Sequence, residues 1–164
     1  MLKVPQGDRM DVTYRKHLNA AAVEVFGTMY FTPVELLTEP PCEEERRFAE
    51  EYVQTSISYW SPGGDETRLD FYFPMELAST IAEGFLGIEI EDVREAQLLD
   101  TMREAGNMIG GNLLGRIDPD GKSRLGIPRA SRATGVAEVI RAAGDVQAFL
   151  SDYGMIWVLV KDAV

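Results

Sequence analysis

Two neighbouring stretches of this chain have the composition of β-strands and are separated by a short turn. Residues 52–60 (YVQTSISYW) and 67–73 (TRLDFYF) are rich in β-branched and aromatic residues, and polar and apolar residues nearly alternate. The connection, SPGGD at residues 61–65, contains two glycines. Strand-like stretches on either side of a Gly-containing connection predict a β-hairpin, so we expect the fold to contain antiparallel sheet.

Further strands and helices are expected on both sides of this hairpin. The other strand predictions are 34–37, 124–128, 146–150 and 155–160. Apolar residues at helical spacing predict two long helices, over 14–31 and 93–114, and a short one that begins at Pro74. Asp92 and Glu95 resemble a capping box at the start of the second long helix. These elements predict an α+β fold, an antiparallel sheet packed with two long helices and one short helix, in a single domain over residues 1–164.

Two segments are less regular. Residues 39–51 contain the run PPCEEE, and we expect a solvated loop there because neighbouring like charges repel and cannot be buried. Residues 134–143 fit either a helix or a strand. Between the last helix and the strands that follow it, Asp118-Pro119-Asp120-Gly121 predicts a turn.

The composition excludes several classes of function. Lys and Arg number 16 and Asp and Glu 27, so the net charge of −11 argues against binding to nucleic acid or to an anionic membrane surface. A single cysteine, Cys42, and a single histidine, His17, argue against a disulfide framework, a zinc site and a His-dependent nucleophilic triad. Residues 1–8 lack the apolar core of a signal peptide, and no run of 18 apolar residues occurs. We therefore expect a cytoplasmic protein without a metal ion of its own.

The second long helix carries an unusual polar face. Asp100, Glu104 and Asn107 fall within about 60° of arc on a helix, on the side away from an apolar stripe, and Gly111 lies on the same side. The apolar stripe comprises Leu99, Met102, Gly106, Ile109 and Leu113. Each glycine inside a helix costs ~1 kcal/mol relative to alanine, so this glycine-rich helix needs a compensation. Either another molecule approaches closely, or the helix crosses another element of its own fold tightly.

The same segment resembles a known signature. Residues 100–112 (DTMREAGNMIGGN) closely resemble the signature helix of the CheC/CheX/FliY phosphatases of bacterial chemotaxis. Residues 71–82 (FYFPMELASTIA) resemble the strand-to-helix segment of that family, and residues 25–29 resemble its first helix. The resemblance covers residues 15–128 and is weakest over 39–51 and after 130. Since Glu-x-x-Asn occurs once in the chain, the resemblance is to the single-site CheX type, which implies a homodimer.

The resemblance also implies a reaction and a partner. The substrate would be the aspartyl phosphate of a CheY-type response regulator in two-component signalling, whose receiver domain already holds Mg²⁺ and a lysine, so no cofactor of this chain is needed. Asn107 would orient the attacking water, and Glu104 would pair with the receiver lysine. Asp100 and Gly111 would contact the partner. The alternative is a non-catalytic CheX-like module that docks a receiver or a flagellar-switch component.

Overall fold

The computed structural model describes residues 10–37, 39 and 41–162. Residues 1–8, for which the sequence predicts no signal peptide, lie outside this part of the chain. The helices are α1 (Val12–Met29), α2 (Met75–Leu86), α3 (Glu95–Ile117) and α4 (Val136–Ala142). The strands are β1 (Glu35–Leu36), β2 (Tyr52–Trp60), β3 (Glu66–Pro74), β4 (Arg124–Leu125), β5 (Arg129–Ala133), β6 (Gln147–Ser151) and β7 (Gly154–Asp162). Short 3₁₀ turns lie at Glu43–Glu45 and Ile90–Asp92.

The strands form one antiparallel sheet. Their order is β1-β6-β7-β3-β2-β4, and β5 pairs with β2 beside β4. The predicted hairpin is confirmed: β2 and β3 pair from Tyr52 with Pro74 to Trp60 with Glu66. The C-terminal pair β6–β7 then inserts beside β3, where Leu69 lies opposite Val160. The α+β fold is therefore as predicted, with an antiparallel sheet at its centre.

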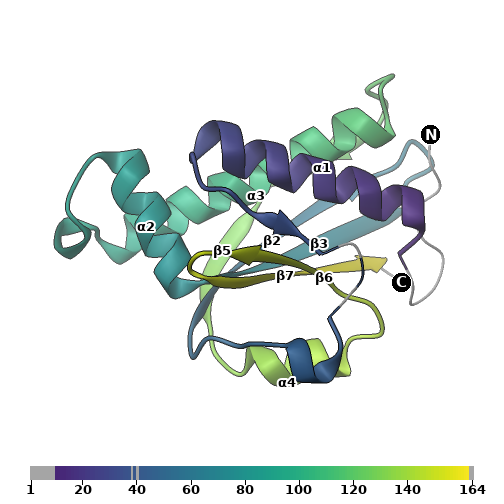
Figure 1. Ribbon diagram of the computed structural model, residues 1–164. Coiled ribbons are helices and arrows are strands. Elements are labelled where there is room, and N and C mark those ends of the chain that lie inside the picture. The colour runs from purple at the N-terminus through teal and green to yellow at the C-terminus, as the bar shows by residue number, and fades with distance from the viewer. Residues whose placement is uncertain (1–9, 38, 40, 163–164) are drawn as a thin grey trace.

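Three helices cover one face of this sheet. Figure 1 shows α1 and α3 lying over the strands, with α2 at one end. Because successive strand residues point to opposite faces, Val53 and Ile57 of β2 enter this core while Gln54 and Ser56 between them do not. Leu18 of α1 and Met102 of α3 belong to the same apolar core, on the side of the helices. The apolar stripes of the two long helices are thus the surfaces that bury the sheet.

The second face of the sheet is partly covered, which corrects the prediction for residues 39–51. Phe48 stacks on Trp157 of β7, with ring centroids 5.1 Å apart, and Val136 and Ile140 of α4 join the same apolar cluster. Figure 1 shows α4 beneath the sheet. The segment is therefore not simply a solvated loop: Glu43, Glu44 and Glu45 are exposed, but Phe48 anchors it. The ambiguous residues 134–143 contain α4, a fourth helix beyond the three predicted.

Some local expectations were wrong in detail. The start of α3 is not capped by Asp92 and Glu95: Arg94 is the N-cap, and its backbone N–H donates to the side chain of Gln97 at 3.0 Å. Leu98 rather than Leu99 is the buried residue in the first turn. The predicted turn after α3 is present, with Gly121 in the left-handed conformation and its N–H bonded to the carbonyl of Asp118.

Candidate functional site

The polar face of α3 points away from the sheet. Met102, Ala105, Ile109 and Leu113 form the buried side of the helix. Asp100, Glu104 and Gly111 are exposed, and Asn107 is half-exposed. The four residues singled out from the sequence thus lie on one accessible side, because the 3.6-residue period separates them from the apolar stripe. Glu104 and Asn107 are one turn apart, so their side chains can reach one bound partner together.

The glycines of α3 divide into two groups. A Cβ atom at Gly106 would lie 2.3 Å from the Cγ2 atom of Thr55, and one at Gly110 would lie 3.4 Å from the Cγ2 atom of Ile57. Both glycines therefore let α3 approach β2 closely, and the tight internal crossing explains them. Gly111 differs, because its nearest neighbour would be the Cδ2 atom of Leu125 at 3.8 Å and the residue is exposed. Gly111, and Gly115 one turn further on, which is also exposed, keep the outer surface of the helix low.

Glu104 and Asn107 are not engaged by the rest of the fold. Within residues 10–37, 39 and 41–162, the side chains of both make no hydrogen bond, and Glu104 makes no ion pair. Asp100, by contrast, accepts a hydrogen bond from Arg103 at 2.6 Å. An unpaired carboxylate and an unpaired amide one turn apart can both bind an incoming partner. Asp100 would first have to break its hydrogen bond with Arg103.

A second asparagine of α3 provides a contrast. The Nε atom of Arg116 donates to the Oδ1 atom of Asn112 at 2.7 Å, and the same guanidinium pairs with Glu24 of α1. Asn112 is therefore held in a link between the two long helices. Glu24 is also the residue followed by Gly27 rather than by an asparagine, so this face of α1 offers no second Glu-x-x-Asn pair.

Tyr30 lies beside Glu104, a neighbour that the sequence analysis did not single out. Burial and, to a smaller extent, the negative charge of Glu104 together raise the pKa of the Tyr30 phenol to about 12. Its hydroxyl lies 3.9 Å from the sulfur of Met108 in α3. The phenol therefore remains neutral around the face of Glu104 and Asn107. Tyr30 follows α1 directly, and no spacing rule links that position to α3.

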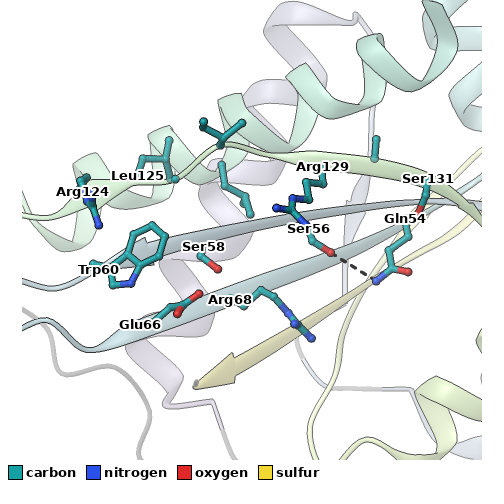
Figure 2. Close-up of a pocket in the computed structure, with 14 residues that line it drawn as sticks. Gln54, Ser56, Ser58, Trp60, Glu66, Arg68, Arg124, Leu125, Arg129 and Ser131 are labelled. Carbon is teal, nitrogen blue, oxygen red and sulfur yellow. Dashed lines mark hydrogen bonds between the residues drawn. The ribbon is translucent and has the colours of Figure 1, made fainter. Parts of the chain in front are cut away.

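A groove of about 940 Å³ lies elsewhere, on the second face of the sheet. Figure 2 shows Arg68, Arg129 and Trp60 around this hollow, between β3 and the β4–β5 edge. Arg124 stacks over the Trp60 ring at 4.7 Å. Arg68 is paired with the buried carboxylate of Asp70 at 3.1 Å. The groove takes its side chains from the sheet and the β4–β5 segment, none from α3, so it is separate from the face of Glu104 and Asn107.

The part of the chain that the structure describes offers no candidate metal site, no candidate membrane-spanning helix and no activated cysteine. No group of three or more His, Cys, Asp or Glu residues in it is placed to hold a metal ion. None of its helices is both long and apolar enough to cross a membrane. Cys42 is exposed among glutamates, whose hydrogen bonds and charges contribute to a thiol pKa above its ordinary value and make it less reactive.

Solved structures of chemotaxis proteins share this fold. A CheC-like superfamily protein from Shewanella sp. PV-4 matches 94% of this chain and 100% of its own, with a TM-score of 0.69 and 19% identity. The chemotaxis protein CheX from Desulfovibrio desulfuricans matches 92% of this chain and 99% of its own, with a TM-score of 0.67 and 15% identity. At these identities the likeness establishes the fold. None of the curated proteins compared with this chain matches it.

The fold therefore defines an α+β protein with the architecture of the CheX and CheC-like chemotaxis proteins. Residues 63–150, which include all of α3, match the family described as "Chemotaxis phosphatase CheX". The chain belongs to the CheX family.

Proposed function

We propose that this protein accelerates hydrolysis of the aspartyl phosphate on a CheY-type response regulator. The family is one of chemotaxis phosphatases. A solved complex of CheX with CheY, BeF₃⁻ and Mg²⁺ from Borrelia burgdorferi has a CheX-like fold in common with this chain, with a TM-score of 0.61, 18% identity and coverage of 94% of this chain and 100% of that one. The observation that carries the proposal is the unpaired Glu104 and Asn107 on the accessible face of α3.

The reaction needs an oriented water more than it needs a nucleophile from the protein. The water oxygen forms a bond to phosphorus while the bond between phosphorus and the aspartyl oxygen breaks, which releases inorganic phosphate and the receiver carboxylate. Asn107 has an amide that can accept and donate a hydrogen bond at once, so it can hold this water in line with the breaking bond. The receiver supplies Mg²⁺ at its own phosphorylation site.

Glu104 has a different role in this proposal. Its carboxylate would pair with a receiver lysine and so set the position of α3 on the receiver. Because Tyr30 beside it stays neutral, the phenol adds no negative charge to this face. Asp100 and Gly111 would lie at the edges of the same contact, with Gly111 allowing the receiver backbone to approach.

We further propose that the protein is a cytoplasmic homodimer with one site in each subunit.

Matched variants of two asparagines in α3 test the catalytic role. Asn107→Ala should lower the rate of phospho-receiver decay on the order of 10²–10³-fold, as is typical for loss of one positioned polar group. Its affinity for the receiver should hardly change, because the amide acts on water in the transition state. Asn112→Ala is the control, since that amide is held by Arg116. Full activity of Asn107→Ala would rule out the water-orienting role of Asn107. Receiver binding by the wild-type protein without faster phosphate release would favour the alternative, a non-catalytic docking module.

Glu104→Gln tests the anchoring role in the same assay. The change should weaken receiver binding as well as lower the rate, and the difference from wild type should shrink at high salt, where the ion pair is already screened. An affinity equal to that of wild type at low salt would rule out the pairing with lysine.

Light scattering tests the proposed homodimer. A stable 18.2 kDa species at high protein concentration would contradict it.

A further inference from the structure

Three large apolar side chains are exposed where α1 and α2 end. Phe31 is 86% exposed, Phe85 52% and Met29 44%. We call these three residues the Phe31 patch. Most single exposed apolar residues need no explanation, but these three are all neighbours of Tyr30. Met29 and Phe31 flank it in the chain, and the ring centroid of Phe85 lies 5.9 Å from that of Tyr30. A cluster of this kind beside a polar helix face is typical of a surface that binds another protein.

The backbone of Phe31 is unusual. With a φ of +50°, Phe31 is the one residue other than glycine among residues 10–37, 39 and 41–162 with a positive φ. A bulky side chain disfavours this conformation because its Cβ atom crowds the backbone. The turn is closed by the N–H of Thr32, which donates to the carbonyl of Phe26 at 2.9 Å. Since the ring is almost fully exposed, burial of Phe31 does not compensate for this cost in the isolated protein.

The patch is continuous with the face of Glu104 and Asn107. Tyr30 connects the two: its ring contacts Phe85, and its hydroxyl lies 3.9 Å from the sulfur of Met108. Met108 follows Asn107 directly in α3. A receiver seated on Asn107 would therefore lie next to Tyr30 and the residues around it.

We propose that the Phe31 patch is the apolar part of the docking surface for the phosphorylated receiver, with the Phe31 ring packed against the receiver beside its phosphorylation site. This inference rests on the proposed function. It explains why an aromatic residue occupies a position that favours glycine: the conformation directs the ring outward to a partner. Glu104 then contributes charge and orientation, Asn107 contributes catalysis, and Phe31 contributes affinity.

Phe31→Gly separates this role from a structural one. The probes are the CheY-type receivers encoded in the same genome, each loaded with BeF₃⁻ and Mg²⁺ so that binding is measured without hydrolysis. The Kd of the receiver that binds should rise about 10- to 30-fold, as for an aromatic residue at the centre of an interface. The turnover rate at saturating phospho-receiver should stay within about twofold of wild type, because Phe31 does not touch the reacting atoms. The melting temperature should be unchanged or higher, since glycine tolerates a positive φ.

Ile127→Ala is the matched control. Ile127 is 90% exposed and lines the groove on the second face of the sheet, so its loss removes apolar surface away from the patch. Its Kd should equal that of wild type. An unchanged Kd for Phe31→Gly, or a lower melting temperature, would overturn the proposal. If wild type binds a receiver without accelerating hydrolysis, the proposed activity fails while the Kd still decides the patch, and if it binds none, both fail.

Discussion

Replacing Gly106 with alanine tests how closely α3 lies on the sheet. The added Cβ atom would lie 2.3 Å from the Cγ2 atom of Thr55, whereas ordinary contacts begin at 3.4 Å. Thr55 cannot rotate this methyl group away without loss, because its hydroxyl donates a hydrogen bond to the carbonyl of Met102 at 3.1 Å inside the core. Helix and strand must therefore move apart, or a buried hydrogen bond must break.

The magnitude follows from three opposing effects. Overpacking of a core costs ~1–3 kcal/mol, and a lost buried hydrogen bond costs ~1 kcal/mol, but alanine stabilises a helix by ~1 kcal/mol relative to glycine. We expect Gly106→Ala to lower the free energy of unfolding by ~1–3 kcal/mol. For a chain of this length the melting temperature should fall by about 2–12 °C. Thermal unfolding followed by circular dichroism, with urea unfolding as a second measure, gives both values.

Two comparison variants make the test specific. Gly115 lies in the same helix but has no atom within 4 Å of an added Cβ, so Gly115→Ala should raise the free energy of unfolding by ~0.5–1 kcal/mol. Thr55→Ser keeps the hydroxyl and removes the methyl group. It should destabilise the wild-type protein but stabilise Gly106→Ala, a coupling that a double-mutant cycle measures. If Gly106→Ala is as stabilising as Gly115→Ala, α3 does not lie this close to β2 and the reasoning is refuted.

Three further changes test other parts of the structure. Tyr30→Phe should make the free energy of unfolding fall less steeply at alkaline pH. The pKa of the Tyr30 phenol is about 12 in the folded protein and 10 in the unfolded chain, so its contribution to folding stability is complete below pH 10 and is lost as pH rises toward 12. Melting temperatures equal to those of wild type from pH 9 to 12 would contradict this. Asp70→Ala should lower stability by ~1–3 kcal/mol in urea unfolding, since Arg68 loses its buried carboxylate partner; an unchanged urea midpoint would count against that role. Gly126→Ala should lower the melting temperature and change tryptophan fluorescence, because the new Cβ atom would lie 2.9 Å from the Trp60 ring; unaltered emission would argue against this contact.

Short-range patterns determined the elements that carry the proposed site. The hairpin of β2 and β3 follows from strand-forming residues on both sides of a glycine-containing turn, and both strands begin and end within one residue of the prediction. The accessible position of Glu104 and Asn107 follows from helical periodicity alone. Each of these features depends on residues close together in the chain, so the sequence is sufficient to predict it.

Other features were decided by contacts between distant residues. From the sequence, Gly106 could serve the close approach of another molecule or a tight crossing of α3 over another element of its own fold. Only the position of Thr55 in β2, which is far away in the sequence, shows that the crossing is the reason. Residues 134–143 fitted helix or strand equally, and α4 forms where Val136 and Ile140 can pack on the second face of the sheet. The exposed ring of Phe31, next to the Tyr30 that contacts α3, has no local signature in the sequence. Periodicity says which residues share a face, but what covers that face depends on the whole chain, because burial is a property of the packed structure.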